Sequence, residues 1–359
     1  MAPRTREELL AYGVPDPLFE AELAANPLRD PQPSDPYYGR NDLAAKREHR
    51  ATRLREFRHL RYLPGPIPDQ VREEDRKIPA RDGHELTIRV YTPVGAPPPE
   101  GGRPLVVMYH EGGWWSGDLS DEEVNCRLFS RDLGAVCVNI DYRLAPEFAF
   151  PTFINDCWDA LQWVAGNASS LGANPSRGFI IGGGSAGGNI AAVLAHLARD
   201  NELSPPLTGQ YLCVPAIMCL LPPEAIPEQY RFEYLSHPSV IPSKDPVSGA
   251  LASDGGAALQ SIVQPDMQSP LFVPFRFGMF GQGHKGLPPA YIQVAGLDPL
   301  RDEGLIYERL LREEAGVATK LDIYPGLPHY FWTNFPRLEK SRQFVENSVQ
   351  GVRWLLEQK

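Results

Sequence analysis

Residues 178–189 read GFIIGGGSAGGN. The apolar run that ends at Ile181 predicts a buried strand, and the run that begins at Asn189 predicts a helix. Between them, Gly183-Gly184-Ser185-Ala186-Gly187 has the G-x-S-x-G pattern of a tight strand-to-helix turn that presents a serine hydroxyl. Only Gly and Ala surround the serine, as a strained turn requires. We therefore expect Ser185 to be a nucleophile at the end of a strand.

The same glycines also have a second possible meaning. Gly182, Gly184 and Gly187 match the G-x-G-x-x-G spacing of a dinucleotide-binding turn. That turn normally opens its fold, and an acid follows about 20 residues later at the end of the second strand. Here three strand-like segments precede the glycines, and the next acid, Asp200, ends a helical segment. The context favours the nucleophile turn.

Strand-like and helix-like segments alternate along most of the chain. Short apolar runs predict strands over 105–109, 136–140, 179–181 and 291–294. Helical patterns cover 121–133, 151–165, 188–199, 299–314 and 337–356. An Asp-Gly turn between 73–79 and 86–92 predicts a hairpin before them. This succession predicts an α/β fold with a mostly parallel central sheet, helices on both faces, and a site at the carboxyl ends of the strands.

Two regions do not follow this alternation. Residues 4–62 predict helices that Pro and Gly interrupt, whereas 220–286 is rich in Pro, Gly and Ser. A structureless insertion of that length is usually a lid or a binding loop. We therefore predict four segments, which are listed here in chain order: a helical cap segment (1–65), the first part of the core (66–219), a cap or lid insertion (220–286) and the last part of the core (287–359).

Several arginines lie in the first of these segments, namely Arg47, Arg50, Arg53, Arg55, Arg58 and Arg61. Such a run resembles a nucleic-acid-binding helix, but a solvated or salt-bridged face is its commoner meaning. The whole chain has 35 basic and 45 acidic residues, hence a formal charge of −10, which repels polyanions. We expect no nucleic-acid partner.

The expected cellular location is inferred from the absence of a signal peptide and of a long apolar run. Its first ten residues include Arg4, Arg6, Glu7 and Glu8 and lack the apolar core of a signal peptide, and no later run of about 18 apolar residues occurs. The cysteines are odd in number and lack C-x-x-C spacing, so we predict buried free thiols rather than disulfides or a zinc site. A soluble cytoplasmic protein without a membrane span is expected.

A serine hydroxyl needs a base and an acid that orients the base. Asp298 follows a predicted strand at 290–295, and His329 follows another at 320–324. In proteins with this strand-turn-helix serine motif, the serine comes first in the chain, the acid second and the histidine third. Asp302 competes with Asp298, although it could equally cap a helix. We expect Ser185, Asp298 and His329 to form the catalytic set.

The oxyanion of a tetrahedral intermediate needs hydrogen-bond donors. His110-Glu111-Gly112-Gly113-Trp114 follows the strand predicted at 105–109. Glycines let backbone N–H groups approach a ligand without an intervening side chain. The N–H groups of Gly112, Gly113 and Ala186 are therefore predicted to form an oxyanion hole.

These motifs resemble those of the hormone-sensitive-lipase group of α/β-hydrolases. The matching segments are 110–114, 141–147, 183–189, 298–304 and 325–329. The resemblance implies the α/β-hydrolase fold with a helical cap, carboxylester hydrolysis by the set named above, and no cofactor or metal. Two positions depart from the group: Glu111 replaces its first glycine, and Gly184 replaces the aspartate before the nucleophile.

Some functional alternatives share the same residues. An acyltransferase, a lactone hydrolase or a cyclase of secondary metabolism would use the same three side chains. An arylformamidase has a similar elbow, and a non-catalytic receptor of this group would lack a member of the set. A looser similarity connects the chain to fungal esterases that act on polyketide intermediates. The expected partner is a small-molecule ester, with the chain a monomer or homodimer.

Overall fold

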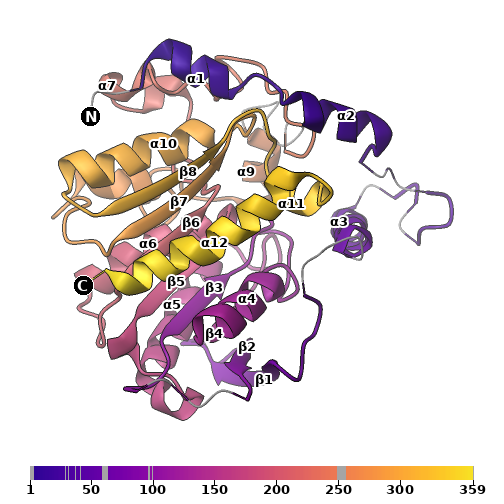
Figure 1. The fold of residues 1–359 in the computed structure, drawn as a ribbon. Helices are drawn as coiled ribbons and strands as arrows, with labels where there is room; N and C mark the ends of the chain where they lie inside the picture. The colour runs from indigo at the N-terminus through magenta and orange to yellow at the C-terminus, as the bar shows by residue number, and fades with distance from the viewer. Residues whose placement is uncertain are drawn as a thin grey trace.

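A single sheet organises the computed structural model, which describes residues 4–28, 30, 32–36, 38–40, 42–58, 64–95, 98, 100–248 and 256–358, with backbone only for 55–58. The strand order within that part of the chain is β1-β2-β4-β3-β5-β6-β7-β8 (Figure 1). The bounds are β1 Val71–Pro79, β2 Glu85–Pro93, β3 Leu105–Tyr109, β4 Val136–Asp141, β5 Phe179–Gly184, β6 Gly209–Cys213, β7 Ala290–Ala295 and β8 Thr319–Tyr324. Strands β3 to β8 run parallel to one another, whereas β2 pairs antiparallel with both of its neighbours, β1 and β4. The mostly parallel sheet that the sequence predicts is thus confirmed.

Helices cover both faces of this sheet. The elements α4 (Glu123–Leu133) and α12 (Glu339–Glu357) lie on one face, and α5 (Thr152–Asn167), α6 (Ala186–Asp200) and α10 (Arg301–Arg309) lie on the other (Figure 1). A π-helical turn at Leu310–Glu314 continues α10. Alternate residues of β3 belong to different core clusters, Leu105 and Val107 to one and Val106 and Met108 to the other. The central strands are buried on both sides, which explains their continuous apolar runs.

The N-terminal segment forms helices, as predicted: α1 (Arg6–Tyr12), α2 (Pro17–Ala25) and α3 (Leu43–Arg58). Asp16 caps α2 by accepting the N–H of Leu18 at 2.8 Å. The N–H of the same aspartate donates to the carbonyl of Gly326 at 3.0 Å. The link between α1 and α2 therefore packs on the loop that leads to His329.

The insertion is more regular than its composition predicts. It contains η3 (Pro223–Ala225), α7 (Glu228–Arg231), α9 (Ala257–Val263) and η4 (Pro274–Met279). The buried carboxylate of Glu303, on α10, accepts the N–H groups of Met218, Cys219 and Leu220 at 2.6 to 3.0 Å. The insertion is therefore not structureless, and Glu303 of the core holds the backbone at Leu220, where the insertion begins.

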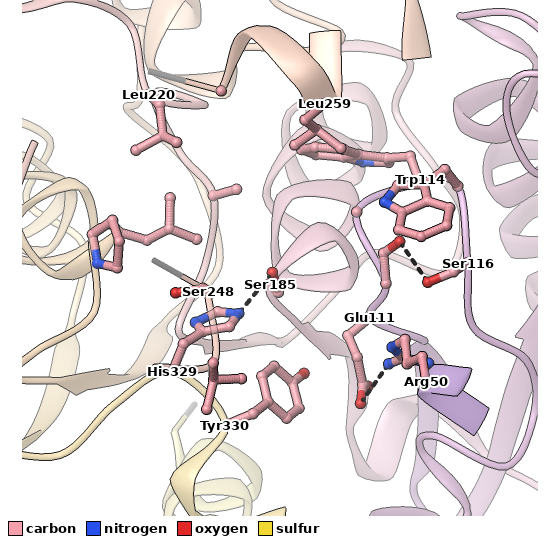
Figure 2. Close-up of a pocket in the computed structure, with 18 of the residues that line it drawn as sticks. Arg50, Glu111, Trp114, Ser116, Ser185, Leu220, Ser248, Leu259, His329 and Tyr330 are labelled. Carbon is pink, nitrogen blue, oxygen red and sulfur yellow. Dashed lines mark hydrogen bonds and ion pairs between the residues drawn. The ribbon is translucent and has the colours of Figure 1, made fainter. Parts of the chain in front are cut away.

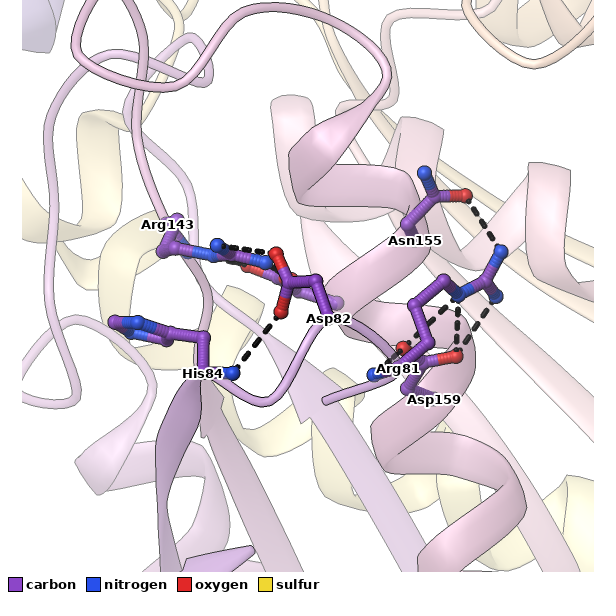
Figure 3. A network of polar contacts seen from close by, with 7 residues as sticks. Arg81, Asp82, His84, Arg143, Asn155 and Asp159 are labelled. Atoms are coloured by element: carbon purple, nitrogen blue, oxygen red, sulfur yellow. Dashed lines mark hydrogen bonds and ion pairs between the residues drawn. The ribbon is translucent and has the colours of Figure 1, made fainter. Parts of the chain in front are cut away.

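Ion pairs attach the early hairpin to α5. Arg81, in the β1–β2 turn, pairs with Asp159 at 2.7 Å (Figure 3). Arg143 follows β4 and pairs with Asp82 at 2.8 Å and with Asp156 at 2.6 Å. Arg143 belongs to the motif at 141–147, so that motif holds the loop after β4 in place.

All five cysteines are buried and free, as predicted. In the described ranges, every helix is too short or too polar to cross a bilayer. The strand β6 ends at Cys213, which lies in an apolar, strand-like run of the sequence.

Candidate active site

The turn after β5 places Ser185 at the carboxyl end of the sheet. Its backbone has φ 53° and ψ −111°, a conformation that costs free energy for a residue with a side chain. A Cβ at Gly183 would lie 2.3 Å from the carbonyl oxygen of Tyr109, and a Cβ at Gly187 would lie 1.9 Å from it. The flanking glycines are thus required for close packing against β3.

The structure brings the three predicted side chains together. His329 Nε2 lies 3.1 Å from Ser185 Oγ (Figure 2). On the other side of the ring, His329 Nδ1 lies 2.6 Å from Asp298 Oδ2. They come from the ends of β5, β7 and β8, and Asp298 and His329 are both under a tenth exposed. The second oxygen of Asp298 accepts the N–H of Leu300 at 2.8 Å, which fixes the carboxylate.

The competing acid, Asp302, faces another part of the molecule. It accepts the N–H groups of Leu235 and Ser236 at 2.7 and 2.6 Å and pairs with Arg301 at 2.6 Å. Each acid of the stretch 298–304 therefore has a separate partner. Asp298 contacts the histidine, whereas Asp302 and Glu303 hold backbone of the insertion.

A second carboxylate lies against His329. Asp245, from the insertion, accepts the histidine backbone N–H at 2.6 Å. Burial and the nearby Asp298 carboxylate raise the pKa of Asp245 to about 6. Burial by itself would lower the pKa of His329, but the Asp298 carboxylate outweighs it and raises that pKa above its ordinary value.

The two glycines after β3 have positive φ angles, which residues with a side chain rarely adopt. Gly112 has φ 119° and Gly113 has φ 63°. A Cβ on Gly112 would lie 1.9 Å from the carbonyl oxygen of Ser116. Within the described residues, no hydrogen bond takes up the N–H of Gly112, Gly113 or Ala186. These three donors are available to a ligand oxygen.

Buried contacts fix this glycine segment. The rings of His110 and Tyr142 stack at 4.0 Å between centroids, and the tyrosine hydroxyl donates to the carbonyl of His110 at 2.9 Å. Arg47, on α3, donates to the carbonyl of Trp115 at 2.6 Å. The N-terminal segment thus supports the predicted oxyanion hole directly.

The two departures from the family pattern lie near each other. A Cβ at Gly184 would lie 1.6 Å from the hydroxyl oxygen of Tyr330, so the usual aspartate has no room here. Figure 2 shows Tyr330 beside His329, with Glu111 across from it. The Glu111 carboxylate pairs with Arg50 at 3.4 Å, and Arg50 also pairs with Asp121 at 3.1 Å. An aromatic ring replaces the missing aspartate, and a cation from α3 neutralises the added glutamate.

A cavity of about 190 Å³ opens at Ser185 and His329. Apolar side chains form most of its wall, and they include Leu54, Trp114, Trp115, Leu220, Val247, Leu259, Phe272, Leu300 and Tyr330. The segments 1–65 and 220–286 both contribute lining residues.

Four residues at this site were not singled out from the sequence as site residues: Asp245, Tyr330, Arg50 and Arg53. The first two lie beside His329, and the two arginines line the cavity. Arg47 forms an ion pair with Glu147, and Arg50 forms one with Glu111. For these two arginines, the interpretation of the run as a salt-bridged face is confirmed. Side chains of Arg55, Arg58 and Arg61 lie outside the described residues.

Known proteins share this architecture. A family model described as "alpha/beta hydrolase fold" matches residues 106–333. An AB hydrolase superfamily protein of Schizosaccharomyces pombe is 42% identical over 291 residues, 81% of this chain and 82% of that protein. Versiconal hemiacetal acetate esterase of Dothistroma septosporum is 35% identical over 287 residues, 79% of this chain and 82% of that protein. The crystal structure of vibralactone cyclase has a TM-score of 0.81 and 34% identity, covering 96% of both chains.

The family model supports the predicted fold, and the match to an esterase supports the predicted class of enzyme. The resemblance to the hormone-sensitive-lipase group is thereby confirmed, and the looser resemblance to a fungal esterase is confirmed by the Dothistroma septosporum match. The chain belongs to the α/β-hydrolase-fold family, in its hormone-sensitive-lipase-like branch, and it is a hydrolase of the carboxylesterase type.

Proposed function

We propose that this esterase cleaves small to medium acyl or aryl esters with Ser185 as nucleophile, His329 as general base and Asp298 as the acid that orients the base. The observation that carries the proposal is the continuous contact from Ser185 Oγ through His329 to Asp298, in which Ser185 and His329 line the cavity. A receptor that had lost catalysis would lack one of these groups, and this chain has all three.

The proposed reaction has two halves. His329 Nε2 takes the Ser185 proton while Oγ bonds to the ester carbonyl carbon, and the resulting imidazolium then protonates the departing alcohol. In the second half, His329 takes a proton from water, the hydroxide oxygen bonds to the acyl carbon, and the proton returns to Ser185. The Asp298 carboxylate stabilises the imidazolium in both halves.

The N–H groups of Gly112, Gly113 and Ala186 would bind the carbonyl oxygen as it becomes negative. Each such donor contributes about 2.7 to 4 kcal/mol to the transition state. We place the cap over this site in the two segments 1–65 and 220–286, because both line the cavity. The apolar wall suits an alkyl or aryl group.

A second candidate reaction is transfer of the acyl group to an alcohol or an internal hydroxyl rather than to water. The similarity to vibralactone cyclase over 96% of the chain favours it. Both reactions share the acyl-enzyme and differ in the acceptor. Product analysis with and without added alcohol separates them.

Covalent labelling tests the proposed nucleophile. A fluorophosphonate should react once per chain, with Ser185 Oγ bonding to phosphorus, fluoride leaving and His329 taking the proton. Mass spectrometry of peptides should place the adduct on Ser185. An adduct on Ser248, which lines the same cavity, would contradict the proposal.

The pH dependence should show the raised pKa of His329. Only the neutral imidazole can accept the serine proton, so kcat/KM should fall as pH drops through a midpoint above about 6.5. The Asp245 carboxylate, whose pKa is about 6, titrates nearby and favours the imidazolium. Asp245→Asn should therefore move the midpoint to lower pH. A flat profile between about pH 5 and 8 would rule out His329 as the base.

A further inference from the structure

The cavity contains more cationic charge than the proposed chemistry uses. Apart from His329, its charged lining residues are Arg50, Arg53 and Glu111. Arg50 pairs with both Glu111 and Asp121. That cation therefore already has counter-ions from the protein.

Arg53 differs from Arg50 in its partners. It lies three residues further along α3, so both side chains are on the same face of the helix. Within the described part of the chain, no carboxylate forms an ion pair with Arg53, and its partly buried side chain has a buried Nε without a hydrogen-bond partner. Burial, followed by repulsion from Arg50, lowers the pKa of Arg53.

An arginine stays protonated in proteins even when its pKa falls. Its planar guanidinium presents paired N–H donors that match the two oxygens of a carboxylate. A partly buried guanidinium in an apolar cavity would gain a counter-ion and acceptors for its N–H groups from such a ligand. The apolar residues Leu54 and Trp115, which line the cavity with it, suit a hydrocarbon spacer.

We propose that Arg53 binds a carboxylate on the substrate, so that the preferred substrates are esters that also carry a free carboxylate separated from the ester by an apolar spacer. This inference rests on the proposed ester cleavage at Ser185. It makes Arg53 a specificity-determining residue with no part in bond cleavage.

Matched ester pairs test the inference on both sides of the scissile bond. On the acyl side, p-nitrophenyl hemiglutarate is compared with p-nitrophenyl valerate. On the alcohol side, para-acetoxybenzoate is compared with its methyl ester. In at least one pair, the wild-type protein should have a higher kcat/KM for the anionic ester, and Arg53→Met should lower the anionic-to-neutral ratio about ten- to hundred-fold, mainly through KM.

Two further variants sharpen the test. Arg53→Lys should retain part of the ratio, because it keeps the charge but loses the paired donors. Arg342→Met is the matched control, since Arg342 lies on α12, outside the cavity lining, and forms an exposed ion pair with Glu346. It should leave the ratio unchanged. Added salt should reduce the wild-type ratio more than that of Arg53→Met.

The outcomes are distinguishable. Equal anionic-to-neutral ratios for wild type and Arg53→Met in both pairs would overturn the inference while leaving ester cleavage intact. Such a result would mean that water solvates the Arg53 side chain. Failure of the wild-type protein to hydrolyse any of the four esters would instead reject the proposed function, and the inference with it.

Discussion

Replacement of Ser185 by alanine is expected to lower kcat for a p-nitrophenyl ester by about three to six orders of magnitude. The change removes only Oγ, the atom that lies 3.1 Å from His329 Nε2. Alanine is smaller than serine, so it adds no new contact in the turn. The variant should therefore fold like the wild type, which circular dichroism and a thermal melt can check.

Some catalysis should remain in this variant. The donors at Gly112, Gly113 and Ala186 would still bind the carbonyl oxygen, and water could attack directly. Ser248→Ala is the matched control, because this second hydroxyl also lines the cavity. Its Oγ donates to Asp245 at 2.9 Å, so we expect a loss of about tenfold or less. The assignment fails if Ser248→Ala is the more damaging change.

The fold and the contact among the three proposed catalytic side chains were predictable because their signals are local. Ser185, Asp298 and His329 each follow a short apolar strand, and parallel strands bring their carboxyl ends to one edge of a sheet. The choice between Asp298 and Asp302 was harder, since the two lie four residues apart at the start of one helix. The contact at 2.6 Å with His329 favours Asp298.

The surroundings of the triad were not predictable in the same way. Asp245 lies in a segment without periodicity and meets His329 only through tertiary packing. Tyr330 fills the space beside Gly184 because the backbone after His329 is left-handed, with φ 54°. Neither contact leaves a pattern in nearby sequence. The arginines of α3 have a helical pattern, but no local feature separates a side chain that enters the cavity from one in water.

Asp298→Asn should lower kcat by about three to four orders of magnitude with little effect on folding. Asparagine keeps the size of the side chain and can still accept the N–H of Leu300 through its oxygen. Its amide nitrogen, facing His329 Nδ1, would favour the tautomer with the proton on Nε2. That tautomer cannot accept the serine proton, and the imidazolium would lose its counter-ion. The residual activity should also have its acid midpoint at lower pH, because the Asp298 carboxylate raises the pKa of His329.

Asp302→Asn is the comparison that decides between the two acids. Asp302 is fully buried and binds Arg301 together with backbone N–H groups of the insertion, so its loss of charge should destabilise the fold by about 1 to 3 kcal/mol. The kcat of the folded variant should stay within about tenfold of wild type, since no atom of Asp302 contacts His329. Parallel measurement of kcat and the thermal midpoint should separate the variants, one losing turnover and the other stability. The reverse pattern would reassign the orienting acid to Asp302 and would require the loop after β7 to rearrange, because in the structure its carboxylate faces the insertion.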